Sequence, residues 1–105
     1  DNYIIMCHVL SDSKDNFWQY QGKNGQGAKK AVEFMLPYML DKSTWPYSKD
    51  VMYHDDYPSR MSFMIFAGYT LGIKELIEIY QSLPNESDVD EVRRNTTIRQ
   101  PFLWL

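Results

Sequence analysis

Three arginines are the side chains in this sequence best suited to bind an anionic ligand. Arg60, Arg94 and Arg99 each carry a guanidinium, which binds a carboxylate through two parallel hydrogen bonds. We therefore name all three as candidate ligand contacts. Each also has a structural interpretation, which we prefer. Arg60 lies in the first turn of a predicted helix, and Arg99 is placed to hold the C-terminal tail. Arg93 and Arg94 lie in the last turn of another predicted helix, where their charges favour the helix dipole and Arg94 compensates the C-terminus.

His54, Asp55 and Asp56 form the cluster that most resembles a set of metal ligands. A metal site needs ligands that converge on one point, and neighbours in sequence rarely do so. The second histidine, His8, lies in an apolar segment and is expected in a core or on a helix face. We therefore predict a solvated turn, no metal site and no cofactor. The two adjacent carboxylates are weak candidates for acid–base chemistry, and His54 is kept as a candidate substrate contact.

Aromatic residues make up 15% of the chain and offer a second kind of contact. Trp18, Trp45 and Trp104 have flat faces on which a sugar ring can stack, but such residues also fill hydrophobic cores. Core packing is the commoner role, and we prefer it for each tryptophan. Trp45 is kept as a candidate substrate contact.

Length, charge and cysteine content limit the possible functions. With 105 residues the chain is long enough for one small domain. Its net charge of −3 gives no basic field, so we predict no nucleic-acid partner. No apolar run reaches the ~20 residues of a membrane span, so we predict no membrane partner. Cys7 is the single cysteine, which excludes an internal disulfide, and its apolar neighbours predict a small buried side chain.

Hydrophobic periodicity predicts helices that would position these residues. The segments are 26–36, 59–69, 73–80 and 87–94, and in 73–80 the apolar residues form a single stripe. Ser59 and Ser87 are the predicted N-caps of the second and fourth segments. Pro37 is expected to kink or stop the first helix, because it has no N–H to donate. Gly68 and Gly72 permit close packing and a turn.

Two segments have no regular pattern. Residues 41–59 form a long connection with four aromatic residues, which argue for an ordered segment packed on the body of the protein. Residues 101–105 are strongly apolar, so this tail must either pack on the body of the protein or form an exposed apolar patch that favours association.

Four short motifs follow one another between residues 17 and 47. They are FWQY at 17–20, KNGQG at 23–27, FMLPY at 34–38 and WPY at 45–47. Their order and spacing resemble the C-terminal part of the alginate lyase family of polysaccharide lyases. The glycine-rich turn departs from that family, because Asn24 and Gln26 stand where Asp and Arg are usual. The similarity continues through 50–53, Arg60, 66–68 and 94–101.

The resemblance implies a fold. It places a core helix over 3–10, a segment that the residues alone would also allow as a strand, and we choose the helix. It implies an all-α fold in which helical hairpins form part of an (α/α) toroid, with long aromatic-rich loops. Residues 1–105 would be a single all-α domain, the C-terminal fragment of a larger alginate-lyase-like domain. A signal peptide would belong to the longer precursor.

The resemblance also implies a function, β-elimination on a uronic-acid polysaccharide in a periplasmic or secreted setting. In the family an Asn-His pair, an Arg and a Tyr on upstream helices carry the reaction. No Asn-His dipeptide occurs in this chain, so we transfer no catalytic residue and expect no lyase activity from it alone. The alternative is a stand-alone all-α sugar-binding or protein-interaction module. A chain that exists alone with an interrupted core helix and an apolar tail is expected to self-associate.

Overall fold

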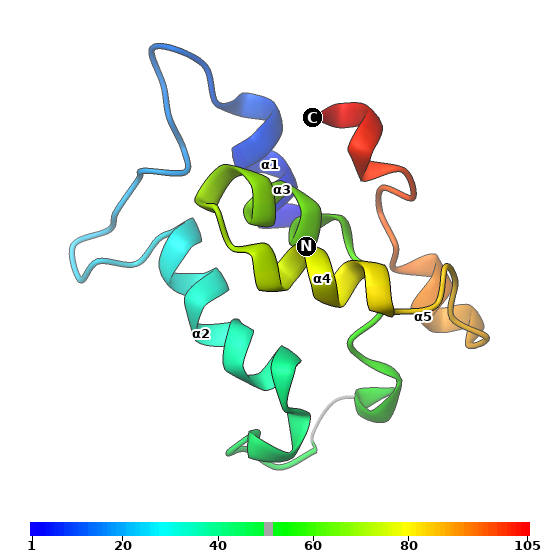
Figure 1. The fold of residues 1–105 in the computed structure, drawn as a ribbon. Coiled ribbons are helices and arrows are strands. Elements are labelled where there is room, and N and C mark those ends of the chain that lie inside the picture. Colours follow the sequence, from blue (N-terminus) through cyan, green and yellow to red (C-terminus); the bar gives the residue numbers. More distant parts are fainter. Residues whose placement is uncertain (50–51) are drawn as a thin grey trace.

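The computed structural model describes residues 1–49 and 52–105, and every regular element in these ranges is helical (Figure 1). The α-helices are α1 (Asn2–Leu10), α2 (Ala28–Leu40), α3 (Ser62–Leu71), α4 (Lys74–Ser82) and α5 (Asp90–Arg94). Three short 3-10 helices accompany them: η1 (Lys42–Thr44), η2 (His54–Asp56) and η3 (Pro101–Trp104). The predicted all-α class is confirmed for these residues, and the toroid stays a prediction.

The helix α3 lies at the centre of the structure. Its segment is apolar on nearly every side, and such a helix is buried on more than one face. Met64, Ile65, Phe66 and Ala67 have no exposed surface. The helix contacts α1, α2, α4 and the C-terminal turn η3 (Figure 1). The other elements are therefore positioned by their packing on α3.

A tight hairpin joins α3 to α4. Gly72 lies between the two helices with φ of 71°, in the left-handed region that glycine adopts most readily. Gly68 faces α4 so closely that a Cβ atom there would lie 2.7 Å from Cγ1 of Ile77. Leu76 and Tyr80 of α4 are buried, which confirms the predicted apolar stripe.

The start of α3 differs from the prediction. The helix begins at Ser62 with Met61 at the N-cap position, so the prediction of Ser59 as the cap is wrong. The carboxylate of Asp1 performs the capping instead. It accepts hydrogen bonds from the Ser62 hydroxyl at 3.0 Å and from the Phe63 N–H at 2.8 Å. This cap comes from 62 residues away in the sequence, so no local pattern announces it.

The start of α5 also differs. Its N-cap is Val89, so the prediction of Ser87 is wrong. The Ser87 hydroxyl instead accepts a hydrogen bond from the Val89 N–H at 3.1 Å, in the turn that precedes the helix. The predicted place of Arg93 and Arg94 in the last helical turn is confirmed.

The helix α2 passes through Pro37 and ends at Leu40, so of the two outcomes predicted at the proline, a kink or a stop, the stop is excluded. The carbonyl of Pro37 still accepts a hydrogen bond from the Asp41 N–H at 2.9 Å. Leu36 and Met39, on either side of Pro37, pack against the core. This packing offsets the hydrogen bond that proline cannot donate.

The helix predicted over 3–10 is confirmed as α1, and the predicted burial of Cys7 in it is confirmed. The ring of His8 stacks on Phe66 at 4.2 Å between centroids, and His8 Nε2 lies 2.7 Å from the carbonyl oxygen of Trp104. His8 is therefore the satisfied helix-face residue that was predicted.

The core role predicted for Trp18 is confirmed. The core role predicted for Trp104 is wrong, because this residue is 55% exposed on the terminal turn η3.

The connection 41–59 contains η1 and η2, and aromatic contacts hold its first part in place. Trp45 packs edge-to-face between Tyr38 and Tyr47, with ring centroids 5.1 Å and 5.2 Å apart. The Lys42 ammonium donates hydrogen bonds to the carbonyls of His54 and Tyr57, which ties the two 3-10 turns together. Of the resembling segment 50–53, residues 50 and 51 lie outside the described part.

Candidate functional site

A cavity of about 470 Å³ lies between the end of α4, α5 and the segment that precedes η3. Three arginines and one glutamate line it, namely Arg60, Arg93, Arg99 and Glu86. We call it the arginine cavity. These four side chains carry a net charge of +2, from three positive charges and one negative charge, and the ion pair of Arg93 with Asp90 offsets one unit of it. The chain as a whole has a net charge of −3, so this cavity concentrates positive charge in an acidic protein.

Arg60 is held by the C-terminal end of α4. Its Nε donates to the carbonyl of Tyr80 at 2.8 Å, its Nη2 donates to the carbonyl of Gln81 at 3.1 Å, and its Nη1 donates to Oδ1 of Asn85. The guanidinium also lies 5.1 Å from the centroid of the Tyr80 ring. A cation at this end of a helix stabilises the helix dipole. Arg60 precedes α3, so the prediction that it lies in the first turn of that helix is wrong.

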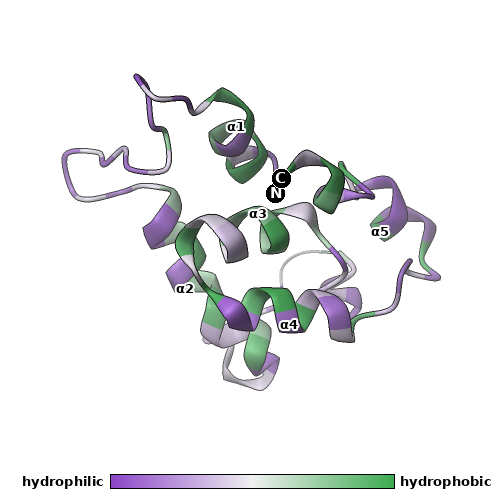
Figure 2. Cartoon of the chain, turned by 45° about the horizontal axis from the view of Figure 1, so that its top comes forward, coloured by the Kyte–Doolittle hydropathy of each residue, from purple (hydrophilic) through white to green (hydrophobic). Residues whose placement is uncertain are grey.

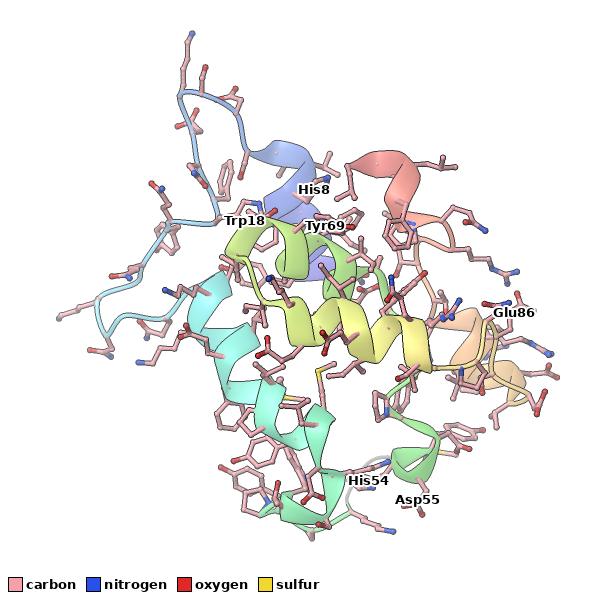
Figure 3. The ribbon with its side chains drawn as sticks, in the orientation of Figure 1. His8, Trp18, His54, Asp55, Tyr69 and Glu86 are labelled. Carbon is pink, nitrogen blue, oxygen red and sulfur yellow. The ribbon has the colours of Figure 1, made fainter. Side chains whose placement is uncertain are left out.

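Arg99 is the arginine of the cavity that can change partner most easily. Its Nη1 lies 2.8 Å from Oε1 of Glu86, and the two side chains are 64% and 56% exposed. An exposed ion pair of this kind contributes only about 0–1 kcal/mol, so a carboxylate from a ligand can replace Glu86 at little cost. The pair joins the segment before the tail to the connection between α4 and α5, near the Glu86 label in Figure 3.

Arg93 and a neutral hydroxyl complete the polar lining. Arg93 pairs with Asp90 one turn earlier in α5. Ser59 also lines the cavity, and its Oγ is buried without a hydrogen-bond partner among the described residues. A buried polar group is normally hydrogen-bonded, so this hydroxyl is a group that a polar ligand would satisfy. Guanidinium groups, a hydroxyl and the ring of Tyr80 together suit a ligand that carries carboxylates and hydroxyls.

The five residues predicted from the sequence as substrate contacts lie in three places. Arg60 and Arg99 line the arginine cavity. Arg94 does not line it and pairs with Glu91 on α5. Trp45 and His54 line a separate apolar pocket of about 260 Å³, which also includes Lys42. Figure 3 shows His54 well away from Glu86 of the arginine cavity.

The His54 cluster shows no metal-site geometry. Nδ1 of His54 lies 3.5 Å from Oδ1 of Asp55 without forming a hydrogen bond, and Asp55 and Asp56 are exposed on η2. Lys49 donates a hydrogen bond to Asp55 at 2.6 Å, which lowers the pKa of that carboxyl below its ordinary value. Within residues 1–49 and 52–105, no group of three or more His, Cys, Asp or Glu side chains could hold a metal ion.

Sequence reasoning missed Arg93, Glu86 and Ser59 as lining residues of the arginine cavity. Arg93 was assigned only to the helix dipole, and Ser59 only to a cap. The lining residues are spread from Ser59 to Phe102, so folding and not local spacing brings them together. No short motif could have indicated the cavity.

A family comparison finds that residues 1–45 match the alginate lyase family. The match confirms the resemblance over α1, the glycine-rich loop, α2 and η1, and it ends at Trp45. No curated protein and no solved structure matches the chain. The arginine cavity lies in the remainder of the chain, outside the matched residues. In the described residues, no helix is both long and apolar enough to span a membrane.

Proposed function

We propose that this chain is a helical portion of an alginate-lyase-like polysaccharide lyase and that it binds a uronic-acid polysaccharide through the arginine cavity. The observation that carries the proposal is the collection of Arg60, Arg93 and Arg99 around one cavity of an acidic chain. The family match over residues 1–45 supports a uronic-acid polysaccharide as the proposed ligand. As part of the same proposal, the helices contribute to an (α/α) toroid. The protein is periplasmic or secreted, because polymeric uronates are degraded outside the cytoplasm.

The chemistry of uronates explains why arginines are needed. The proton removed in β-elimination lies beside a carboxylate, whose negative charge opposes formation of the carbanion. Binding groups must therefore neutralise that carboxylate. Arg99 neutralises the carboxylate by giving up its ion pair with Glu86 and pairing with the ligand. Arg60 adds a second positive charge, and its hydrogen bonds to the end of α4 hold its guanidinium in place. The unpartnered Ser59 hydroxyl supplies a hydrogen bond to the sugar.

The proposal assigns binding and not chemistry to this chain. The sequence contains no Asn-His dipeptide, the pair that the resemblance links to the family reaction. We propose that the residues which remove and donate the proton lie outside these 105 residues. The chain alone then binds uronate oligosaccharides without cleaving them.

Calorimetric titration with alginate oligosaccharides tests the proposal. Arg99→Gln should weaken binding by about five-fold, the effect of losing about 1 kcal/mol from one exposed ion pair. Arg94→Gln is the matched control, because Arg94 is also an exposed arginine paired with a glutamate but does not line the cavity. Equal affinities of wild type and Arg99→Gln would contradict the proposed site. An increase in absorbance from unsaturated uronate products would refute the non-catalytic role.

A second candidate function is favoured by the exposed apolar side chains of α1 and the tail. Met6, Val9, Leu103 and Trp104 are exposed, and the hydrogen bond between His8 and Trp104 joins the two segments. Figure 2 shows most of both segments in green, the colour of hydrophobic residues. Neither segment contains Asp, Glu, Lys or Arg. A surface of this kind suits protein interaction or self-association. Light scattering over a range of concentrations tests it, and a constant monomer mass would count against self-association.

A further inference from the structure

The loop between α1 and α2 borders a second polar cavity, which shares no lining residue with the arginine cavity. Its volume is about 580 Å³, within the roughly 300–1,000 Å³ typical of small-molecule sites. The walls come from the loop, the first turns of α2 and the end of α3, and we call it the loop cavity. Figure 1 shows this loop standing away from the helices.

The neutral lining of the loop cavity suits a sugar. Three side-chain amides line it, those of Asn16, Gln19 and Gln21, together with the hydroxyl of Thr70. An amide both donates and accepts hydrogen bonds, as does a hydroxyl, so these groups complement the hydroxyls of a saccharide. Oδ1 of Asn16 already accepts a hydrogen bond from the Trp18 N–H. The groups that an apolar ligand would leave unpaired, at a cost in binding free energy, are therefore the amides of Gln19 and Gln21 and the Thr70 hydroxyl.

Two lysines give the loop cavity a positive charge. Lys29, Lys30 and Glu33 line it, with a net charge of +1 from two positive charges and one negative charge. Nζ of Lys29 lies 3.7 Å from Oε1 of Glu33, and Nζ of Lys30 lies 3.5 Å from the carbonyl oxygen of Asn24. These are long contacts, so a carboxylate can engage either ammonium without breaking a strong interaction.

An aromatic ring lies open beside these polar groups. The side chain of Tyr20 is 63% exposed, whereas that of Trp18 is 7% exposed and anchors the loop in the core. Figure 3 shows Trp18 at the base of the loop, close to the end of α3. Tyr20 therefore offers a ring face to a sugar, and Trp18 fixes the position of the segment that carries it.

The backbone of the loop holds Tyr20 against the start of α2. A Cβ atom at Gly27 would lie 2.3 Å from the carbonyl oxygen of Tyr20, so only glycine allows this approach. The N–H of Gly22 also donates to the carbonyl of Gln26 at 2.7 Å, which closes the turn between them. The glycines thus bring the aromatic ring and the lysines to one cavity.

We propose that the loop cavity is a second saccharide-binding site, which takes a uronate unit of an anionic polysaccharide. Lys29 and Lys30 bind the carboxylate, the amides bind the hydroxyls, and Tyr20 stacks on the ring. The inference rests on the proposed function in one respect, the choice of a uronate chain as ligand. The cavity, its charge and its lining are independent of the arginine cavity.

Nitrogen-15 NMR spectra of the full chain, titrated with an alginate tetrasaccharide, test the inference. The expected result is a saturable shift of the Lys30 and Thr70 amides that a neutral cello-oligosaccharide does not produce. Lys30→Gln should weaken this response by about five-fold, the effect of one exposed ion pair. Lys23→Gln is the control, because Lys23 belongs to the same loop but does not line the cavity, and it should leave the response unchanged.

The spectra separate this inference from the proposed function. Shifts confined to residues of the arginine cavity would overturn the second site and leave the proposed function standing. Shifts confined to the loop cavity would support the second site and overturn the assignment of binding to the arginines. No shift at either cavity would overturn both. An equal response to the neutral oligosaccharide, or an equal loss in the Lys23→Gln control, would overturn the role of the lysines.

Discussion

Replacement of Gly68 by alanine is the sharpest test of how the hairpin of α3 and α4 is packed. The added Cβ would lie 2.7 Å from Cγ1 of Ile77 and 3.3 Å from the carbonyl oxygen of Ile73. The nearer atom is not the flexible end of a side chain, so the two helices must separate or Ile77 must leave its rotamer. We therefore expect Gly68→Ala to destabilise the protein, although alanine is the better helix former.

Two opposing terms set the size of this effect. Alanine in a helix interior gains about 1 kcal/mol over glycine, whereas overpacking a filled core costs about 1–3 kcal/mol. The expected net loss in the free energy of unfolding is therefore up to about 2 kcal/mol. In an Ile77→Ala background the contacts with Cγ1 and Cδ1 of Ile77 disappear, and the contact with the Ile73 carbonyl oxygen at 3.3 Å remains. There, Gly68→Ala should be neutral or stabilising.

Urea denaturation followed by circular dichroism measures the four proteins of this double-mutant cycle. The control is Gly72→Ala, where φ of 71° imposes a cost of about 1–2 kcal/mol and nothing lies within 4 Å of an added Cβ. That cost should be the same in both backgrounds. The packing argument is refuted if Gly68→Ala is equally costly with and without the Ile77 side chain.

Three further predictions concern the contacts that fix the ends and loops of the helices. Asp1→Ala removes the carboxylate that accepts from the Phe63 N–H and should lower the free energy of unfolding by about 1 kcal/mol in urea denaturation. An unchanged value would show that the cap contributes nothing. Lys42→Met removes two hydrogen bonds to carbonyls of the long connection, so limited proteolysis should cleave the connection faster, while cleavage in the α1–α2 loop should be unchanged. The pKa of Asp12 is lowered by hydrogen bonds from two backbone N–H groups of its own loop. The ionised Asp12 carboxylate therefore stabilises the folded state above its unfolded-state pKa, and this contribution is lost as the pH falls through its lower, folded-state pKa. An NMR titration of the Asp12 carboxyl should show it, and an ordinary or raised pKa would contradict it.

The helices were predictable because their signals are local. The apolar stripe of 73–80 and the all-round apolar pattern of α3 follow from residues three and four positions apart. Gly72 marks the turn between them by its own conformational freedom. The helix starts were less predictable, because the cap of α3 comes from Asp1, which only the folded chain brings close.

The candidate site was only partly predictable for the same reason. The sequence indicated Arg60 and Arg99 by their chemistry, but nothing in it showed that they line one cavity while Arg94 faces elsewhere. The preferred structural role of Arg60 agrees with its hydrogen bonds to the end of α4. The partner of Arg99, Glu86, lies 13 positions away, beyond any helical spacing.

The most direct test of the central claim, that the arginine cavity binds uronates, is the affinity of Glu86→Gln for alginate oligosaccharides. Glu86 occupies the guanidinium of Arg99, so its carboxylate competes with that of the ligand. Removing this negative charge should raise the affinity by about five-fold, the equivalent of about 1 kcal/mol, and a gain cannot arise from misfolding. The neighbouring change Glu91→Gln frees Arg94, which lies outside the cavity, and should leave the affinity unchanged. An affinity of Glu86→Gln equal to or below that of the wild type would contradict the account.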